Sequence, residues 1–178
     1  MRPIPAWVES VSPELEFVRR ATERAAGNAS AEALAHAPDG KWSSLQVMEH
    51  LVLSYTATTK GLLRALETGR PERANCTLEQ RLRGVYVLGV GRFPPGVEAP
   101  KQTVPRAGLG EDPLRRFNDA LVAMDSMLAD AEKRFGRETK ILMHPILGPL
   151  TAQQWRRFHF VHGRHHLKQI VSRVNGRA

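Results

Sequence analysis

Four of the seven histidines in this 178-residue chain lie in the stretch HFVHGRHHLKQI, close to its C-terminal end. His162 and His166 are one helical turn apart, so they project from the same side of an α-helix. Two imidazoles at this spacing can each give one nitrogen to the same cation, as the histidine pair of HExxH metalloproteases does. A third neutral nitrogen would complete a site with an open coordination position, which suits zinc, nickel or another late divalent metal.

His50 is the candidate for the third ligand, because it is the only other histidine in the interior of a long predicted helix. His159 lies near the same arc as His162, and His165 lies about a quarter turn away, so both are less favoured as ligands. The alternative interpretation is that these histidines are hydrogen-bonded residues of a core.

Other reactive groups are less informative. Cys76 is the only cysteine and lies in an irregular segment without a neighbouring cue for activation, so we interpret it as a bystander. A single cysteine excludes an internal disulfide and fits a reducing compartment, which favours the cytoplasm. Glu49 precedes His50 but projects about 100° away from it on a helix, so we expect a surface residue and no general base.

Four amphipathic helices are predicted to position these histidines. The first has Ser12 as its expected N-cap and Pro13 at its first position, and the last follows a Thr151/Gln154 capping-box pattern. In the second helix, small side chains follow His50 along its side and are expected to leave space beside the imidazole. These small residues are Ser54, Ala57 and Gly61. The expected helices span residues 12–26, 43–69, 112–136 and 152–174.

Two connections carry further expectations. Residues 70–111 are rich in proline and glycine, and we predict an ordered crossover that covers one end of a pocket and holds a short helix from Thr77 toward Val90. Residues 137–149 are predicted to form a loop or a short extended piece. The fold class is therefore all-α, a four-helix bundle, with residues 1–178 forming a single domain.

Composition limits the partners. No segment approaches the ~20 apolar residues needed to span a bilayer, and the first residues lack the apolar run of a signal peptide, so we expect a soluble protein. The net charge of +8 favours anionic partners. Nucleic acid is an unfavoured one, because the basic residues are scattered and aromatic residues make up only 6% of the chain.

Two segments, KWSSLQVMEHLVLSY and HPILGPLTAQQWRRFHFVHGRHHLKQI, resemble the DinB/YfiT-like superfamily of four-helix metal-binding proteins. The matching residues are Trp42, Ser43, His50 and Leu51 in the first and His162, His166, Gln169 and Ile170 in the second. The resemblance implies an up-down-down-up bundle with a long crossover from its second to its third helix. It also implies that His50, His162 and His166 bind the metal. The HPILGPLT segment resembles a largely uncharacterised subgroup, in which His144 either approaches the site or has a packing or loop-capping role.

The resemblance also implies a function. Characterised members include thiol-dependent S-transferases, in which the metal binds a low-molecular-weight thiol as its thiolate and lowers its pKa. A metal-bound hydroxide would give hydrolysis from the same geometry, and the sequence does not choose between these reactions. In either case the substrate is a small-molecule electrophile. The alternative function is a non-enzymatic metal- or nucleic-acid-binding module with a basic surface.

Two features of the last helix leave alternatives open. Arg156, Arg157 and Arg164 could clamp the carboxylates of a thiol, but Arg157 and Arg164 lie on the face opposite the histidine pair. Phe160, Leu167 and Val171 lie outside the inward arc, where they pack either on a neighbouring helix or on a second copy in a homodimer.

Overall fold

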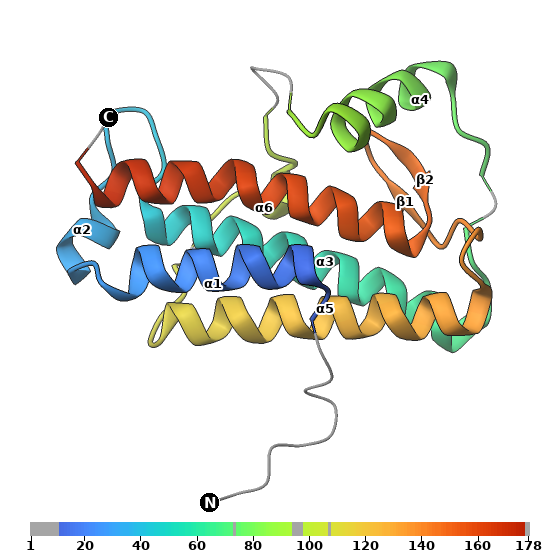
Figure 1. Ribbon diagram of the computed structural model, residues 1–178, viewed down its shortest axis with the longest axis horizontal. Coiled ribbons are helices and arrows are strands. Elements are labelled where there is room, and N and C mark those ends of the chain that lie inside the picture. The colour runs from blue at the N-terminus through green and yellow to red at the C-terminus, as the bar shows by residue number, and fades with distance from the viewer. Residues whose placement is uncertain (1–10, 73, 94–97, 107, 177–178) are drawn as a thin grey trace, which may run out of the picture.

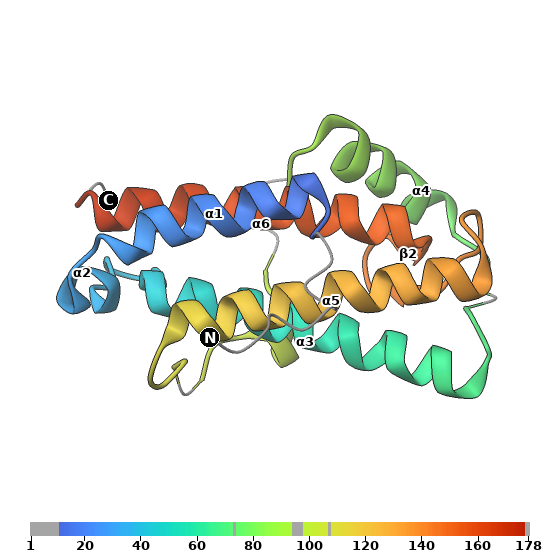
Figure 2. The ribbon, with the colours of Figure 1, turned by 60° about the horizontal axis from the view of Figure 1, so that its bottom comes forward.

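The structure is a computed structural model and describes residues 11–72, 74–93, 98–106 and 108–176. Four long helices form a bundle, in which α1 lies beside α6 and α3 lies beside α5 (Figures 1 and 2). Helices α1 and α6 run in one direction and α3 and α5 in the other (Figure 1), so the predicted up-down-down-up order is confirmed. Their bounds are α1 Pro13–Gly27, α3 Ser44–Thr68, α5 Pro113–Phe135 and α6 Ala152–Val174.

The connections hold short elements. The crossover from α3 to α5 contains a helix that changes from α to π geometry and ends at Val90, so the predicted short helix is confirmed. The predicted extended piece is an antiparallel hairpin that pairs Leu142 with Leu150 and His144 with Gly148. These elements are α2 Ala31–Ala35, α4 Leu78–Gly84, the π-helix η1 Val85–Val90, the 3₁₀ helix η2 Lys101–Thr103, β1 Leu142–His144 and β2 Gly148–Leu150.

Side-chain caps fix where most helices begin. Ser43 with Gln46 and Thr151 with Gln154 form reciprocal capping boxes at the starts of α3 and α6, as the sequence pattern predicts for α6. Ser12 precedes α1, but its hydroxyl makes no capping bond. Its backbone N–H instead donates to the Asp125 carboxylate at 2.6 Å, so α5 fixes the start of α1.

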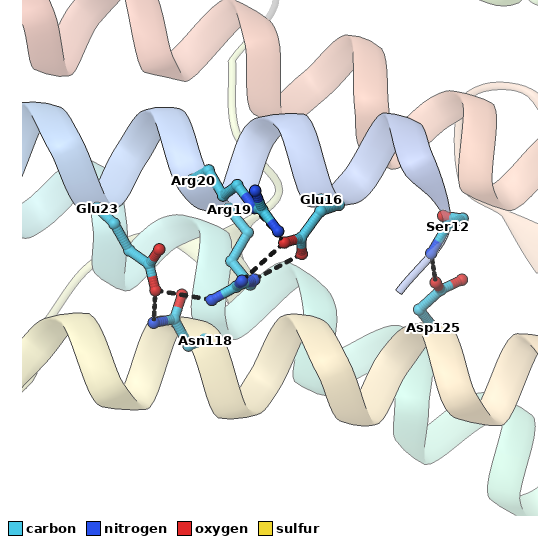
Figure 3. Close-up of polar contacts among 7 residues, drawn as sticks. All are labelled: Ser12, Glu16, Arg19, Arg20, Glu23, Asn118 and Asp125. Atoms are coloured by element: carbon cyan, nitrogen blue, oxygen red, sulfur yellow. Dashed lines mark hydrogen bonds and ion pairs between the residues drawn. The ribbon is translucent and has the colours of Figure 1, made fainter. Parts of the chain in front are cut away.

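A polar seam joins α1 to α5 (Figure 3). Arg19 donates to Glu16 at 2.7 Å and to Glu23 at 2.8 Å, and Asn118 of α5 donates to Glu23 at 2.6 Å. The hydrogen bonds from Arg19, with a smaller contribution from Arg20, lower the pKa of Glu16 to about 2. The seam therefore adds polar contacts to the apolar core that α1 shares with α5.

Close packing brings α6 against α1 and α3. A methyl group at Gly163 would lie 2.7 Å from a Val18 methyl and 3.4 Å from the Tyr55 hydroxyl, so only glycine fits there. Gly61 of α3 similarly makes room for Leu142 of the hairpin, because a methyl group at residue 61 would lie 2.7 Å from that leucine. Within the part of the chain that the structure describes, no helix has the length and apolar character that crossing a bilayer requires.

Candidate metal centre

Three imidazoles from two helices converge in the interior. The Nε2 atom of His162 lies 3.0 Å from Nε2 of His50 and 3.1 Å from Nε2 of His166. All three side chains are buried, and their candidate ligand atoms lie within 4.8 Å of one another. The predicted convergence of α3 and α6 on one point is therefore confirmed as geometry.

Hydrogen bonds fix the protons of two of these rings. The Nδ1–H of His50 donates to the Thr103 carbonyl oxygen at 2.8 Å, because a carbonyl can only accept. The Nδ1–H of His166 donates to Gln169 Oε1 at 2.9 Å, while the Gln169 amide nitrogen lies 3.2 Å from Nε2 of His165 and donates to it. The Nε2 atoms of His50 and His166 therefore both present lone pairs toward His162.

This arrangement leaves a deficit of protons. A hydrogen on Nε2 of His162 can bond to only one neighbour at a time, so at least one short contact sets two lone pairs against each other. Nδ1 of His162 is enclosed and has no hydrogen-bond partner among the described residues. Nitrogens bound to one cation at ~2.0–2.1 Å lie roughly 2.9–3.4 Å apart at right to tetrahedral angles. The observed contacts of 3.0 and 3.1 Å fit that spacing.

Burial keeps the three rings neutral. Desolvation is the main cause that lowers the pKa of His166 to about 3, and the neighbouring His50 adds to it. The pKa of His162 is also lowered by burial and by its neighbours, and burial lowers that of His50 despite its bond to Thr103. Neutral imidazole is the form that ligates metals.

The cluster opens into a cavity of about 990 Å³ that runs along α6. Toward the start of α6 the cavity has an aromatic arm, which we define by Phe93, Ile146, Trp155 and Phe158. Toward the end of α6 it has a cationic arm, which we define by Arg173; Lys41 and the acidic Glu98 also line the cavity. The three histidines lie between the two arms, since His162 and His166 separate Trp155 from Arg173 along the helix.

Aromatic rings surround the cluster. The ring of Trp42 lies 5.2 Å from that of His50, and Phe93 lies 5.6 Å from His162, measured between centroids. Phe158 stacks on His162 at 5.4 Å with an interplanar angle of 14°. These rings give the cluster apolar surroundings, in which electrostatic interactions are stronger than in water.

Described residues of the crossover line the cavity, as predicted. Arg157 donates to the Leu88 carbonyl at 3.0 Å and Arg164 donates to the Gly91 carbonyl at 2.8 Å, which holds η1 on α6 and places Phe93 over His162. Arg156 pairs with Asp125 at 2.7 Å and with Glu132. These three arginines hold the fold together, so the suggestion that they clamp a thiol is wrong.

Glu49 is a second correction. The sequence predicts a surface residue, but Glu49 is buried because the crossover passes over it. Its two carboxylate oxygens accept backbone bonds from Arg106 at 3.1 Å and from Gly108 at 2.9 Å. Helical geometry correctly predicted that Glu49 projects away from His50. The crossover that covers Glu49 could not be predicted, because that segment has no periodic pattern.

The remaining histidines have distinct places. His159 is fully buried, bonds to the Thr58 hydroxyl at 3.0 Å through Nε2, and packs on Tyr55, which fits a core residue. His165 is exposed at the rim of the cavity, where Gln169 donates to it. His144 has the loop-capping role, since its Nδ1 accepts backbone bonds from two residues of the hairpin turn, and its ring also lines the cavity.

Two smaller expectations have separate outcomes. Ser54 and Ala57 line the cavity near His50 as expected, but the space beside Gly61 holds Leu142 and no imidazole. The Cys76 thiol lies 3.8 Å from the Leu147 carbonyl and outside the described lining of the cavity. Arg173 and Thr103 belong to the site's surroundings and were missed, because neither lies in a motif with chemical spacing.

The fold and the cluster together define a class: an all-α four-helix bundle whose crossover closes a cavity over three neutral histidines. A family model described as the DinB superfamily matches residues 14–170. The chain belongs to the DinB superfamily, which is a metal-binding family. No curated protein and no solved structure matches the chain significantly.

Proposed function

We propose that the chain is a divalent-metal-dependent enzyme in which His50, His162 and His166 hold the cation. The observation that carries this proposal is the set of three Nε2 atoms at contacts of 3.0 and 3.1 Å, in which at most one contact can hold a proton. Zinc and nickel suit a site of three neutral imidazoles. A cation there lowers the pKa of a thiol or water that binds it, and so supplies a nucleophile near neutral pH.

The residues of this chain support the reaction in three ways. Thr103 and Gln169 fix the ring orientations of His50 and His166. Aromatic rings give the cluster apolar surroundings, and the aromatic arm offers an apolar place for a small electrophilic substrate.

The cationic arm favours a thiol over water as the nucleophile. Arg173 lines the cavity, its Nε is enclosed without a partner among the described residues, and burial lowers its pKa. Low-molecular-weight thiols often carry carboxylates, which a guanidinium binds in bidentate fashion. Arg173 is therefore the group that would bind an anionic thiol, in place of Arg156, Arg157 and Arg164.

Metal analysis tests the first part of the proposal. Protein purified without a polyhistidine tag should contain about one divalent metal per chain, measured by mass spectrometry of the elements. The His50→Ala, His162→Ala and His166→Ala variants should each lose it. The His36→Ala variant is the matched control, because His36 is exposed beside α2 and lies outside the described cavity lining. Wild-type metal content in His50→Ala would show that the assignment is wrong.

Activity assays test the second part. Metal-loaded protein should accelerate the reaction of 1-chloro-2,4-dinitrobenzene with cysteine, and Arg173→Gln should raise the KM for cysteine more than that for the uncharged 2-mercaptoethanol. Thiol-independent hydrolysis of p-nitrophenyl acetate, without thiol transfer, would instead assign the water reaction. A thiol-dependent reaction also suits the reducing cytoplasm, which we retain as the proposed compartment.

Two alternatives have simple tests. A homodimer would use exposed apolar side chains such as Val171, whereas Phe160 already packs on Phe17 of α1. Light scattering on a sizing column decides between one chain and two. A nucleic-acid-binding module would retain DNA or RNA at low ionic strength and lose it steeply with salt. We expect no retention, because the basic residues are scattered along the sequence and aromatic residues make up only 6% of it.

A further inference from the structure

The hydrogen bonds of His144 determine where its proton lies. Its Nδ1 accepts from the backbone N–H groups of Ile146 and Leu147, each at 3.1 Å. Because a backbone N–H can only donate, Nδ1 must carry a lone pair. The proton of the neutral imidazole is therefore on Nε2, at the opposite side of the ring.

This Nε2–H group lacks a partner. No hydrogen bond to it occurs in the part of the chain that the structure describes. The residue is only 8% exposed, its ring lines the cavity, and its Nδ1 is bonded to the hairpin turn. Nε2 is not among the enclosed atoms of the fold, so its N–H is accessible from the cavity, where an acceptor atom of a bound molecule can pair with it.

The donor is held rigidly. The His144 ring lies 4.3 Å from that of Phe158 and 5.3 Å from that of Trp155, between centroids, and residue 144 pairs with Gly148 in the hairpin. Phe158 also stacks on His162. One aromatic ring therefore separates His144 from the cluster, and the donor belongs to the aromatic arm. Burial lowers the pKa of His144 to about 4, so the ring remains neutral at physiological pH.

We propose that His144 Nε2–H is a substrate-binding group that donates to an acceptor oxygen, such as a carbonyl oxygen, of an apolar molecule in the aromatic arm. Only the identity of that molecule as the electrophile rests on the proposed function. The substrate is then an aromatic or apolar compound whose carbonyl-type oxygen lies at His144 while its reacting carbon faces the three histidines. A fixed donor favours such a compound over one of the same shape without the oxygen.

Two substitutions separate this role from turn capping. His144→Asn keeps an acceptor on Cγ, where Nδ1 is attached, so it can still accept from the turn, but it has no group at the position of Nε2. His144→Gln extends a side-chain N–H toward the position of Nε2 but lacks the acceptor for the turn. His144→Asn therefore loses only the donor, and His144→Gln loses only the acceptor for the turn.

The probes are acetophenone and α-methylstyrene, which have the same shape and differ in having C=O or C=CH₂. Their dissociation constants are measured by tryptophan fluorescence and checked by ligand-observed NMR. One hydrogen bond should shift the ratio of the two dissociation constants toward acetophenone by about 2- to 10-fold in the wild type relative to His144→Asn. His144→Gln should retain part of this shift, and His144→Asn should melt closer to the wild type than His144→Gln because it keeps the acceptor for the turn. The inference is wrong if the wild type and His144→Asn have the same ratio.

The measurement is made on both chelator-treated and zinc-loaded protein, so that it does not depend on a metal. If the protein prefers acetophenone but binds no zinc, the His144 site stands and the proposed enzyme is rejected. If the protein binds zinc but shows no preference for acetophenone, only the His144 site is rejected. Imidazole ¹⁵N spectra provide a second readout, since they distinguish the two neutral forms of the ring. Finding the proton on Nδ1 of His144 would overturn the inference even if a variant failed to fold.

Discussion

The Nδ1 atom of His50 donates a 2.8 Å hydrogen bond to the carbonyl oxygen of Thr103, which joins α3 to the crossover at the three-histidine cluster. The adjacent Glu49 accepts two more backbone bonds from the same part of the crossover. The loop that leads into α5 therefore orients a candidate ligand and seals one side of the cavity. The crossover is part of the site as well as a connection, which explains why the bundle tolerates so long a segment between two parallel helices.

Gln169 should matter for metal affinity although it does not lie in the three-histidine cluster. Its Oε1 accepts from Nδ1 of His166 at 2.9 Å and so fixes which nitrogen of that ring faces the cluster. We expect Gln169→Ala to weaken zinc binding by about 10- to 100-fold, the usual cost of losing such a partner. Competition with a chromophoric zinc chelator measures the change.

Gln169→Glu is the matched variant for this prediction. A carboxylate accepts the same bond from His166 and strengthens it, so zinc affinity should equal or exceed that of the wild type. An equal loss in both variants would mean that the amide acts through packing, and would contradict an orienting role for its oxygen.

Metal binding should also stabilise the fold. Zinc at about 100 times its dissociation constant should add roughly 2.7 kcal/mol to the free energy of unfolding, because it binds the native state alone. For a chain of this size that corresponds to a rise in Tm of about 5–10 °C, measured by calorimetry with zinc and with a chelator. The His50→Ala variant should show no difference between the two conditions. A wild-type Tm that is indifferent to chelation would favour histidines with a purely structural role.

The helices were predictable from the sequence because their signals are local. Proline at the first turn of α1, the Thr151 capping box and the apolar spacing of α5 each act within a few residues. The convergence of His162 and His166 followed from helical spacing alone. His50 was a candidate because it is the only other histidine inside a long predicted helix, and the resemblance of two motifs supported it, since nothing local connects α3 to α6.

The unpredicted parts of the site depend on segments that are distant in sequence. Burial of Glu49 and the bond from His50 to Thr103 require the crossover to lie across α3, and no periodic pattern encodes that placement. Arg157 and Arg164 illustrate the same limit. The sequence placed them opposite the histidine pair, but only the structure reveals that this face holds η1.

Gly163→Ala should destabilise the protein although alanine is the better helix former. The added methyl would lie 2.7 Å from a methyl of Val18, which is fully buried and cannot move into solvent. Overpacking of this kind costs about 1–3 kcal/mol, which exceeds the helix-propensity gain of about 1 kcal/mol. Urea denaturation measures the change in the free energy of unfolding. The matched control is Gly84→Ala at the end of α4, where the methyl meets no described atom within 4 Å, and which should be neutral or slightly stabilising.

Mild acid should destabilise the metal-free protein because its buried histidines resist protonation. Burial lowers the pKa of His144 to about 4 and that of His159 to about 3 in the folded state, whereas both titrate near 6.5 in the unfolded chain. Below pH 6.5 these two imidazoles bind protons in the unfolded chain but remain neutral in the folded chain. The free energy of unfolding therefore falls as the pH falls. Each such histidine contributes a slope of about 1.4 kcal/mol per pH unit until its folded pKa is reached.

Urea denaturation between pH 7 and pH 5, with a chelator present, measures this slope without competition from metal. Glu16 interferes little, because its pKa changes from 4.5 to about 2 on folding and therefore affects stability mainly below that interval. His144→Asn removes one titrating group and should reduce the slope by up to about 1.4 kcal/mol per pH unit, while stability at pH 7 changes little because the turn keeps its acceptor. An unchanged slope in this variant would mean that His144 is protonated in the folded state near pH 6, which is incompatible with two backbone N–H groups donating to its Nδ1.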